Sequence, residues 1–450
     1  MTYGTPCATA DERTVLISGA SVAGPAVAYW LRRYGYRPTV VEMAPALRGG
    51  GYAVDFRGSV SLAVLERMGV LDEIRRHRTD GSPLSFIDAS GREVAALPPE
   101  FAGGEVEILR SELSRILYGH SLRTPTKAEP GTAARTTAGI ADPANPIDPA
   151  NPIDPADPAE AADPAESTEF ITEYIFGDSI TSLTEVAGGV HVTFERSAPR
   201  TFDLVIGADG LHSTVRRLAF GPEEQFVSHL GYYIAGWDLP PGGAELGARP
   251  VGYNEPGRLA SVGRTPRRAK DPRYVGEAFC VFASDELIYN RHDTEGQKKL
   301  IAGAYAGCGW RTPELTETVW DADGLYFDSI SRVDVPRWST GRIALLGDAA
   351  YGATVGGMGT GSAVVGAYVL AGELAAAGGD HARAFARYED RLRPFVTRCQ
   401  EGGRQAGEFL APPTQEAIDV RNSLLNNPQA VAAMLQQGED LSEDIELPEY

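Results

Sequence analysis

The stretch "TVLISGASVAGPAVAYWLRRYGYRPTVVE", residues 14–42, decides the fold. Its first five residues, Thr14–Ser18, form an apolar run rich in β-branched side chains, which predicts a buried strand. Residues 22–35 then place apolar side chains at helical spacing and end in glycine, which predicts a helix. Thr39–Glu42 predicts a second strand that ends in an acid. Strand, helix and strand in this order predict a βαβ unit and an α/β fold.

The turn between the first strand and the helix has the pattern of a nucleotide-binding turn. Gly19 permits a tight turn, and Gly24 permits close packing of helix on strand. Ser21 stands where a dinucleotide fingerprint would have glycine, and it is small enough to let the backbone approach a phosphate. Glu42 follows Gly19 by 23 residues and can accept hydrogen bonds from a ribose diol. The predicted nucleotide-binding residues of this unit are Gly19, Ser21, Ala23, Gly24 and Glu42. This pattern does not choose between NAD and FAD, and a plain βα turn remains an alternative.

Length and composition indicate a soluble enzyme-sized chain. Its 450 residues suit two interleaved domains, and 43% hydrophobic and 23% charged residues are typical of globular proteins. No run of 18 apolar residues predicts a membrane span, and residues 1–14 lack the pattern of a secretory signal, so we expect a cytoplasmic protein. The four cysteines have no metal or redox spacing, so we expect no metal site.

The net charge of −20 comes largely from two appendages. Residues 142–169 hold eight acidic side chains and residues 439–450 hold six, and neither segment has a basic one. This acidity argues against nucleic-acid binding and says little about an active site. From Asp142 to Ala159 the chain reads "DPANPIDPANPIDPADPA", so we expect residues 124–167 to be an extended low-complexity insert. The role of this repeat stays open.

Two later motifs repeat the pattern of a strand followed by a glycine turn. "FDLVIGADGLHSTVRR", residues 202–217, starts with an apolar strand and turns through Gly207–Gly210 into a helix. "GRIALLGDAA", residues 341–350, gives a strand and then Gly347–Asp348. A glycine-rich loop at 356–361 and a long apolar helix follow. The sequence therefore predicts two further turns of this kind, in addition to the turn at Gly19, and each carries a polar side chain.

The three motifs, in this order and spacing, resemble those of the class A flavoprotein aromatic hydroxylases, the para-hydroxybenzoate hydroxylase-like family. The closest resemblance is to the branch of tetracycline-degrading flavin monooxygenases, and it covers residues 13–410 apart from the insert. It implies an α/β fold in which a Rossmann-like FAD-binding domain is interleaved with an antiparallel-sheet substrate domain, with C-terminal helices added. The FAD-binding domain would comprise residues 13–80, 106–123, 168–224 and 336–400, the substrate domain 81–105 and 225–335, and the C-terminal helices and acidic tail 401–450.

The resemblance assigns cofactor-binding roles position by position. Glu42 would bind the adenosine ribose, and Arg48 would contact the nicotinamide cofactor and the flavin. In "GGYAVDFRG" and "ILRSELSRIL", Asp55 and Arg110 would lie beside FAD. Asp209 of the "GADG" turn would lie near the junction of the FAD and nicotinamide sites.

The resemblance also places the last motif against the flavin. Asp348 would contact its ribitol or pyrophosphate, and the following loop would direct backbone N–H groups to the flavin ring. The usual Pro-Pro-x-x-Gly-Gln-Gly loop of the family reads "ATVGGMG" here, without the prolines and the glutamine. Gly357 and Gly359 keep the glycine pattern, so we expect backbone donation to survive.

The segments between the motifs predict a second, antiparallel layer. "PLSFIDASGREVAAL", residues 83–97, predicts a hairpin, and "GYYIAGWDL", "EAFCVFAS" and "LYFDSISRVDV" predict strands. The resemblance implies that this sheet lines the substrate pocket, with Trp237, Phe279 and Trp310 as candidate wall residues; each can equally be ordinary core. No Ser/His/Asp or metal constellation is visible around His212 or His292, and no catalytic acid or base can be identified.

The implied reaction is oxygen transfer. NADPH or NADH would reduce FAD, O₂ would add to give a flavin C4a-hydroperoxide, and its oxygen would pass to an aromatic or polycyclic small molecule, as in secondary metabolism or antibiotic modification. A flavin halogenase is disfavoured because no Trp-x-Trp-x-Ile-Pro segment occurs, and a two-Rossmann Baeyer–Villiger enzyme because a second fingerprint is absent. An FAD-dependent reductase, a Baeyer–Villiger-type oxygenase of the same fold and a non-catalytic flavin-binding or ligand-binding protein stay open, as does the oligomeric state.

The C-terminal sequence predicts helices and a loose end. Residues 384–412 have a helical pattern that breaks at Pro412–Pro413, and a further helix is expected over 414–437. We expect these helices to brace the two domains. The last residues, "GEDLSEDIELPEY", are expected to fray.

Overall fold

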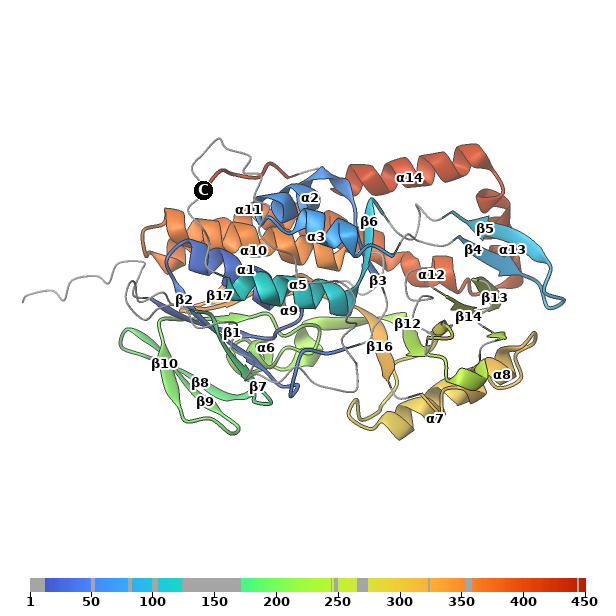
Figure 1. The fold of residues 1–450 in the computed structure, drawn as a ribbon, viewed down its shortest axis with the longest axis horizontal. Coiled ribbons are helices and arrows are strands. Elements are labelled where there is room, and N and C mark those ends of the chain that lie inside the picture. The colour runs from blue at the N-terminus through green and yellow to red at the C-terminus, as the bar shows by residue number, and fades with distance from the viewer. Residues whose placement is uncertain are drawn as a thin grey trace, which may run out of the picture.

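A mostly parallel sheet forms the centre of one half of the molecule (Figure 1). In this computed structural model its strand order is β17-β18-β11-β1-β2-β7. β1 pairs in parallel with β2 and β11, β11 with β18, and β2 with β7, whereas β17 is antiparallel to β18. The predicted βαβ unit is therefore confirmed. The bounds are β1 Thr14–Ser18, β2 Arg37–Glu42, β7 Glu173–Phe176, β11 Leu204–Gly207, β17 Ser339–Thr340 and β18 Ile343–Leu345.

The structure describes residues 13–49, 53–79, 83–98, 104–123, 171–243, 245–246, 250–264, 274–322, 324–352, 358–442 and 445–450. The predicted insert at 124–167 lies outside the described residues, as does Gly357. Within the described part, no helix is both long enough and apolar enough to cross a membrane.

Helices cover one face of this sheet, and small sheets flank it (Figure 1). α1 connects β1 to β2 and packs against α5 and α10, and α10 packs against α11. α10 is buried along most of its length, as expected for a helix that is apolar on all sides. The helices are α1 Ala23–Arg33, α2 Gly58–Arg67, α3 Leu71–Arg76, α5 Arg110–Leu122, α6 Thr214–Ala219, α9 Asp348–Tyr351, α10 Gly359–Ala376 and α11 His381–Arg404. The small sheets are β3 Ala53–Phe56 with β6 Val106–Leu109, and β8 Ile180–Val186 with β9 Gly189–Phe194 and β10 Arg200–Phe202.

The other half is built on a seven-stranded sheet with the order β16-β12-β15-β14-β13-β4-β5. Its pairs are antiparallel except for β13 with β4. The predicted hairpin at 83–97 is confirmed as β4 and β5, and the three predicted strand runs are confirmed as β12, β15 and β16. The bounds are β4 Leu84–Ile87, β5 Glu93–Leu97, β12 Val227–Asp238, β13 Val251–Glu255, β14 Arg258–Gly263, β15 Glu277–Ala283 and β16 Leu325–Val333.

Each face of this sheet has its own hydrophobic cluster. On one face, residues of β12 and β15 pack with side chains of α7 and α8. On the other face, they pack with side chains of α12 and α13, which lie before and after the predicted break at Pro412–Pro413. The single helix expected over 414–437 is in fact two helices, α13 and α14. The bounds are α7 Thr294–Ala304, α8 Thr312–Glu317, α12 Ala406–Leu410, α13 Gln415–Leu425 and α14 Pro428–Ser442, with short 3₁₀ turns η2 Glu223–Gln225 and η3 Pro241–Gly243.

The expectation that the C-terminal end frays is wrong for residues 445–450. The Tyr450 ring lies against Gly372, and its hydroxyl donates to the Glu373 carboxylate at 2.9 Å. The Tyr368 hydroxyl donates to the Pro448 carbonyl at 2.6 Å, and Arg67 pairs with Glu449 at 2.6 Å. An acidic composition indicates disorder only where no partner surface exists, and here α2 and α10 supply cations, rings and hydroxyl donors.

The contact of Tyr450 with Glu373 predicts a measurable loss of stability in Tyr450→Phe. Glu373 is 1% exposed, so a lost donor is not replaced by water, although Arg391 still pairs with the carboxylate at 2.6 Å. We expect the free energy of unfolding in urea to fall by about 1.5–3 kcal/mol. Tyr29→Phe is the control, because the Tyr29 hydroxyl donates to no group among the described residues. Equal midpoints for the two variants would contradict the prediction.

Candidate functional site

Four chain segments reach one edge of the parallel sheet. β1, β2, β11 and β18 run in the same direction, so their carboxyl ends lie together. The residues that follow or end these strands are Gly19, Glu42, Asp209 and Asp348. Open α/β sheets bind their ligands outside this edge. The topology therefore gathers the predicted motifs into one candidate site.

The turn after β1 requires its two glycines. Gly19 has φ of +102°, and a Cβ atom there would lie 2.5 Å from the Ala208 carbonyl oxygen. A Cβ atom on Gly24 would overlap the carbonyl oxygen of Gly19. The helix α1 begins directly after this turn, and its N-cap residue Val22 makes no side-chain hydrogen bond to the first turn. Its first N–H groups are therefore suited to an anionic ligand.

Glu42 lies at the end of β2 and points back to the glycine turn. One carboxylate oxygen accepts from the Ala20 N–H and the other from the Ala44 N–H, both at 2.9 Å. The exposed Arg48 side chain lies 3.6 Å from the same carboxylate. The carboxylate is thus held in place beside the turn, where a ribose diol could reach its remaining lone pairs.

The Ser21 hydroxyl makes a contact that a glycine at this position could not make. Its hydroxyl oxygen accepts from Arg110 Nε at 3.3 Å and Nη2 at 3.2 Å. Arg110 begins α5, so this contact ties α5 to the turn after β1. The departure from the glycine fingerprint therefore has a structural reason: the Ser21 hydroxyl orients the Arg110 guanidinium beside the turn that follows β1.

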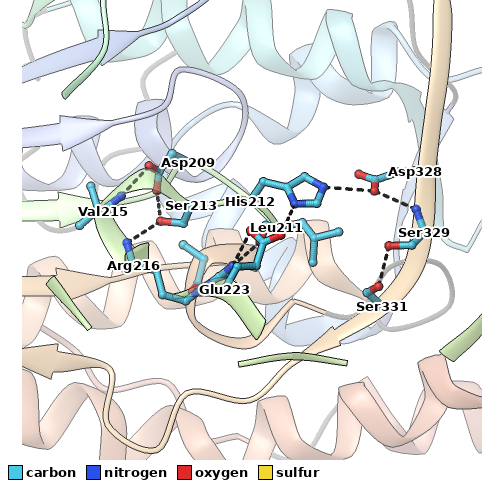
Figure 2. Close-up of polar contacts among 11 residues, drawn as sticks. Asp209, Leu211, His212, Ser213, Val215, Arg216, Glu223, Asp328, Ser329 and Ser331 are labelled. Atoms are coloured by element: carbon cyan, nitrogen blue, oxygen red, sulfur yellow. Dashed lines mark hydrogen bonds and ion pairs between the residues drawn. The ribbon is translucent and has the colours of Figure 1, made fainter. Parts of the chain in front are cut away.

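Asp209 organises the turn after β11 (Figure 2). Its carboxylate accepts from the Val215 N–H at 3.1 Å and from the Ser213 hydroxyl. It also accepts from the Ser18 hydroxyl at 3.1 Å. The surrounding protein raises the pKa of this carboxyl, and the three donors oppose that shift. The carboxylate joins β1 to the loop before α6 and fixes the backbone of the "GADG" turn.

Asp348 begins the short helix α9 directly after Gly347. A Cβ atom on Gly347 would lie 3.3 Å from that of Ala23, so the two motifs are packed against each other. The Asp348 side chain is open to solvent, yet protein surrounds it on several sides. That enclosure raises its pKa, Arg110 lowers it, and repulsion from Asp328 raises it further.

The remaining predicted cofactor residues are less directly joined to this edge. Asp55 lies on β3 and forms an ion pair with Arg57. Gly359 is the first residue of α10, and Met358 before it has φ of +49°. This left-handed conformation is uncommon for methionine and is a form of strain that clusters at functional sites.

The three predicted substrate-wall residues do not share a face. Trp237 is buried in the cluster under α7 and α8, and its Nε1 donates to the Thr318 hydroxyl at 2.9 Å. Trp310 packs against the same cluster. Phe279 is partly buried on the opposite face, with Tyr326 and Phe409 of α12. Phe279 and the two tryptophans therefore cannot line one wall.

The sequence shows no Ser/His/Asp or metal constellation around His212, but the structure gives its ring two carboxylate partners. Its ring lies between the carboxylates of Glu223 and Asp328, at 2.9 Å and 3.3 Å. These partners are 11 and 116 residues away in sequence, so no local spacing could reveal them. Among the described residues no cluster of His, Cys, Asp and Glu could hold a metal ion.

His212 predicts a pH-dependent contribution to stability. Burial lowers the pKa of the imidazole, but the hydrogen bonds and charges of Asp328 and Glu223 outweigh this and raise it to about 9. A group with a raised pKa stabilises the fold fully below its ordinary value of 6.5, and this contribution is lost as the pH rises through about 9. We expect the difference in free energy of unfolding between the wild type and His212→Gln to shrink across this window. A difference that stays constant to pH values above 9 would contradict the assignment.

The chain is similar along most of its length to known flavoenzymes. It is 31% identical over 443 residues to a flavin-dependent monooxygenase of Legionella longbeachae, covering 97% of this chain and 98% of that protein. It is 39% identical over 395 residues to the uncharacterized protein Rv1260 of Mycobacterium tuberculosis, covering 86% and 92%. The crystal structure of the tetracycline destructase Tet(51) superposes with a TM-score of 0.75 at 29% identity, covering 97% of this chain and 100% of that one. No protein-family profile matches the chain.

These similarities, together with the motifs gathered at the carboxyl edge of the parallel sheet, define the class of enzyme. The chain belongs to the FAD-dependent monooxygenases, and the predicted resemblance to their tetracycline-degrading branch is confirmed. Its mixed α/β fold with C-terminal helices is the fold of this family.

Proposed function

We propose that this enzyme binds FAD at the carboxyl edge of the parallel sheet and uses NADPH or NADH and O₂ to oxygenate an aromatic or polycyclic small molecule. The observation that carries the proposal is the meeting of Gly19, Glu42, Asp209 and Asp348 at that edge. Bound there, FAD would supply hydride acceptance from the nicotinamide and activation of O₂.

The residues present fit FAD. The backbone at Gly19 and Gly24 leaves no room for a Cβ atom, as the tight turn and the close packing of α1 on β1 require, and α1 offers its first N–H groups to a pyrophosphate. Glu42 would accept from the ribose hydroxyls, with Arg48 beside it. Arg110 and Asp348, from α5 and α9, would contact the flavin end of the cofactor.

The substrate would lie between this edge and the seven-stranded sheet. β16 leads from that sheet toward this carboxyl edge, because the Val333 N–H donates to the carbonyl of Gly352, directly after α9. Phe279 and Tyr326 on the face near α12 would stack against a flat apolar substrate. The chain's contribution to catalysis is to orient the substrate and to exclude water.

Isotope labelling tests the reaction type. The purified protein is mixed with FAD, NADPH, O₂ and a panel of polycyclic phenols, and products are analysed by mass spectrometry. We expect products with one added oxygen atom, labelled by ¹⁸O₂ and not by H₂¹⁸O.

Other outcomes identify the rival activities. Products that gain two hydrogens with no oxygen label would replace this function with a reductase. A lack of substrate-stimulated NADPH oxidation across the panel would favour a binding protein.

A further inference from the structure

A series of polar contacts through His212 joins the carboxyl edge of the parallel sheet, which we call the motif edge, to the seven-stranded sheet (Figure 2). The imidazole Nδ1 faces a Glu223 carboxylate oxygen at 2.9 Å, and Nε2 faces an Asp328 oxygen at 3.3 Å. Glu223 belongs to η2, whereas Asp328 lies on β16. The His212 side chain is 29% exposed, so the contacts are only partly screened by water. One side chain thus connects two separate elements by two carboxylates.

The groups on both sides of His212 are themselves held in place by further hydrogen bonds. On one side, the Ser213 hydroxyl donates to Asp209 and accepts from the Arg216 N–H at 3.0 Å. The Arg216 guanidinium donates to the carbonyl of Ala349, the residue after Asp348, at 3.0 Å, and lies 3.4 Å from Glu223. On the other side, the Asp328 carboxylate accepts from the Ser329 N–H at 2.8 Å. The position of His212 is therefore coupled to both the Asp209 turn and the Asp348 turn.

The geometry favours the imidazolium form. Each ring nitrogen faces a carboxylate oxygen, and only a doubly protonated ring can donate to both. Other charged or titratable groups lie close by: Arg216 on α6 and the exposed Arg291 of the 284–293 loop lie near Glu223, and Tyr289 lies near Asp328. Among these groups, His212 is the one that faces the Asp328 carboxylate directly, at 3.3 Å.

Asp328 is close enough to the motif edge to affect it electrostatically. Repulsion from Asp328 is one of the causes that raise the pKa of Asp348. A neutral side chain at position 212 would leave the carboxylates of Asp328 and Glu223 with less compensation. Extra negative charge at this edge disfavours a reduced flavin, which carries negative charge itself.

We propose that His212 is a positioning residue whose imidazolium holds and neutralises Asp328 beside the flavin site, and thereby favours the reduced state of bound FAD. The inference rests on the proposed function, because it requires FAD at the motif edge. It assigns His212 no contact with substrate or cofactor. Its effect is on the charge and placement of a carboxylate that comes from the seven-stranded sheet.

The test measures the ratio of reduced to oxidised FAD bound to the protein. A reference dye holds the solution at one fixed reduction potential. In His212→Gln we expect this ratio to fall by about threefold or more. The reason is the loss of one positive charge whose interaction with the reduced flavin is partly screened by solvent. In Asp328→Asn the ratio should rise, because a negative charge is removed. The double variant should return toward the wild-type ratio. His191→Gln, on the small β8–β10 sheet, makes the same substitution away from the site and is the control.

A second readout does not depend on the cofactor. With ¹³C-labelled histidine, the wild-type His212 ring should stay protonated up to about pH 9 in the NMR titration. A ring that titrates near 6.5, the ordinary value, would overturn the proposal even if His212→Gln failed to fold. Ratios that fall in both single variants would also overturn it and indicate a structural role alone. A protein that binds no FAD refutes the proposed function, whereas unchanged ratios in FAD-loaded variants refute this inference only.

Discussion

Gly24→Ala is expected to remove both the stability and the flavin of this protein. The added methyl group would overlap the Gly19 carbonyl oxygen, which belongs to the turn that we propose faces the cofactor. Neither atom can give way cheaply, because Gly19 is itself bounded by the Ala208 carbonyl and has φ of +102°. We expect a loss of about 3 kcal/mol or more in the free energy of unfolding in urea. Absorbance of the purified protein should show little or no bound flavin.

Two glycines separate steric overlap from other effects. Gly49→Ala adds a methyl group with no atom within 4 Å, and φ there is ordinary, so its unfolding midpoint should match the wild type. Gly69→Ala also enters open space but at φ of +74°, so it should cost only about 1–2 kcal/mol. If Gly24→Ala unfolded at the same urea concentration as Gly49→Ala, the described turn would be wrong.

Glu42→Ala is expected to weaken FAD binding by about 10- to 150-fold, which corresponds to losing one charged hydrogen-bond acceptor. The carboxylate would accept from the ribose, and it also holds the N–H groups of Ala20 and Ala44 at 2.9 Å. The change should therefore loosen the turn as well as remove a ligand contact. Fluorescence titration of the FAD-free protein with FAD measures the dissociation constant.

Two further variants show how Glu42 acts. Glu42→Gln keeps an acceptor but loses the charge and the contact with Arg48 at 3.6 Å, so its affinity should lie between the wild type and the alanine variant. Glu93→Ala removes an exposed carboxylate on β5 and should leave affinity unchanged. An unaltered dissociation constant in Glu42→Ala would exclude Glu42 from the cofactor site.

Local sequence was sufficient wherever the physical cause is local. The apolar run before Gly19 and the acid at Glu42 predicted the βαβ unit, because strand, turn and helix are specified by residues that are near neighbours in sequence. The hairpin at 83–97 and the break at Pro412–Pro413 were predictable for the same reason. The edge that gathers Asp209 and Asp348 follows from parallel strands whose carboxyl ends must coincide.

The structure corrected what depends on distant pairing. Strand register sets the face of the seven-stranded sheet on which an aromatic residue lies. Trp237 and Phe279, on the neighbouring strands β12 and β15, lie on opposite faces. The acidic tail looked solvated by composition, yet Tyr450 finds the buried Glu373 on α10. Composition cannot report a partner surface that is 77 residues away.

The sequence by itself determined the fold class, the family and the positions of the predicted nucleotide-binding motifs, because each of these is encoded in short segments with fixed spacing. Only the tertiary structure decided that Ser21 holds Arg110, and that His212 lies between Glu223 and Asp328. The charge state of a histidine depends on the groups within a few ångströms of its ring. For His212 one of those groups comes from β16, a strand of the other sheet, and only folding brings it there.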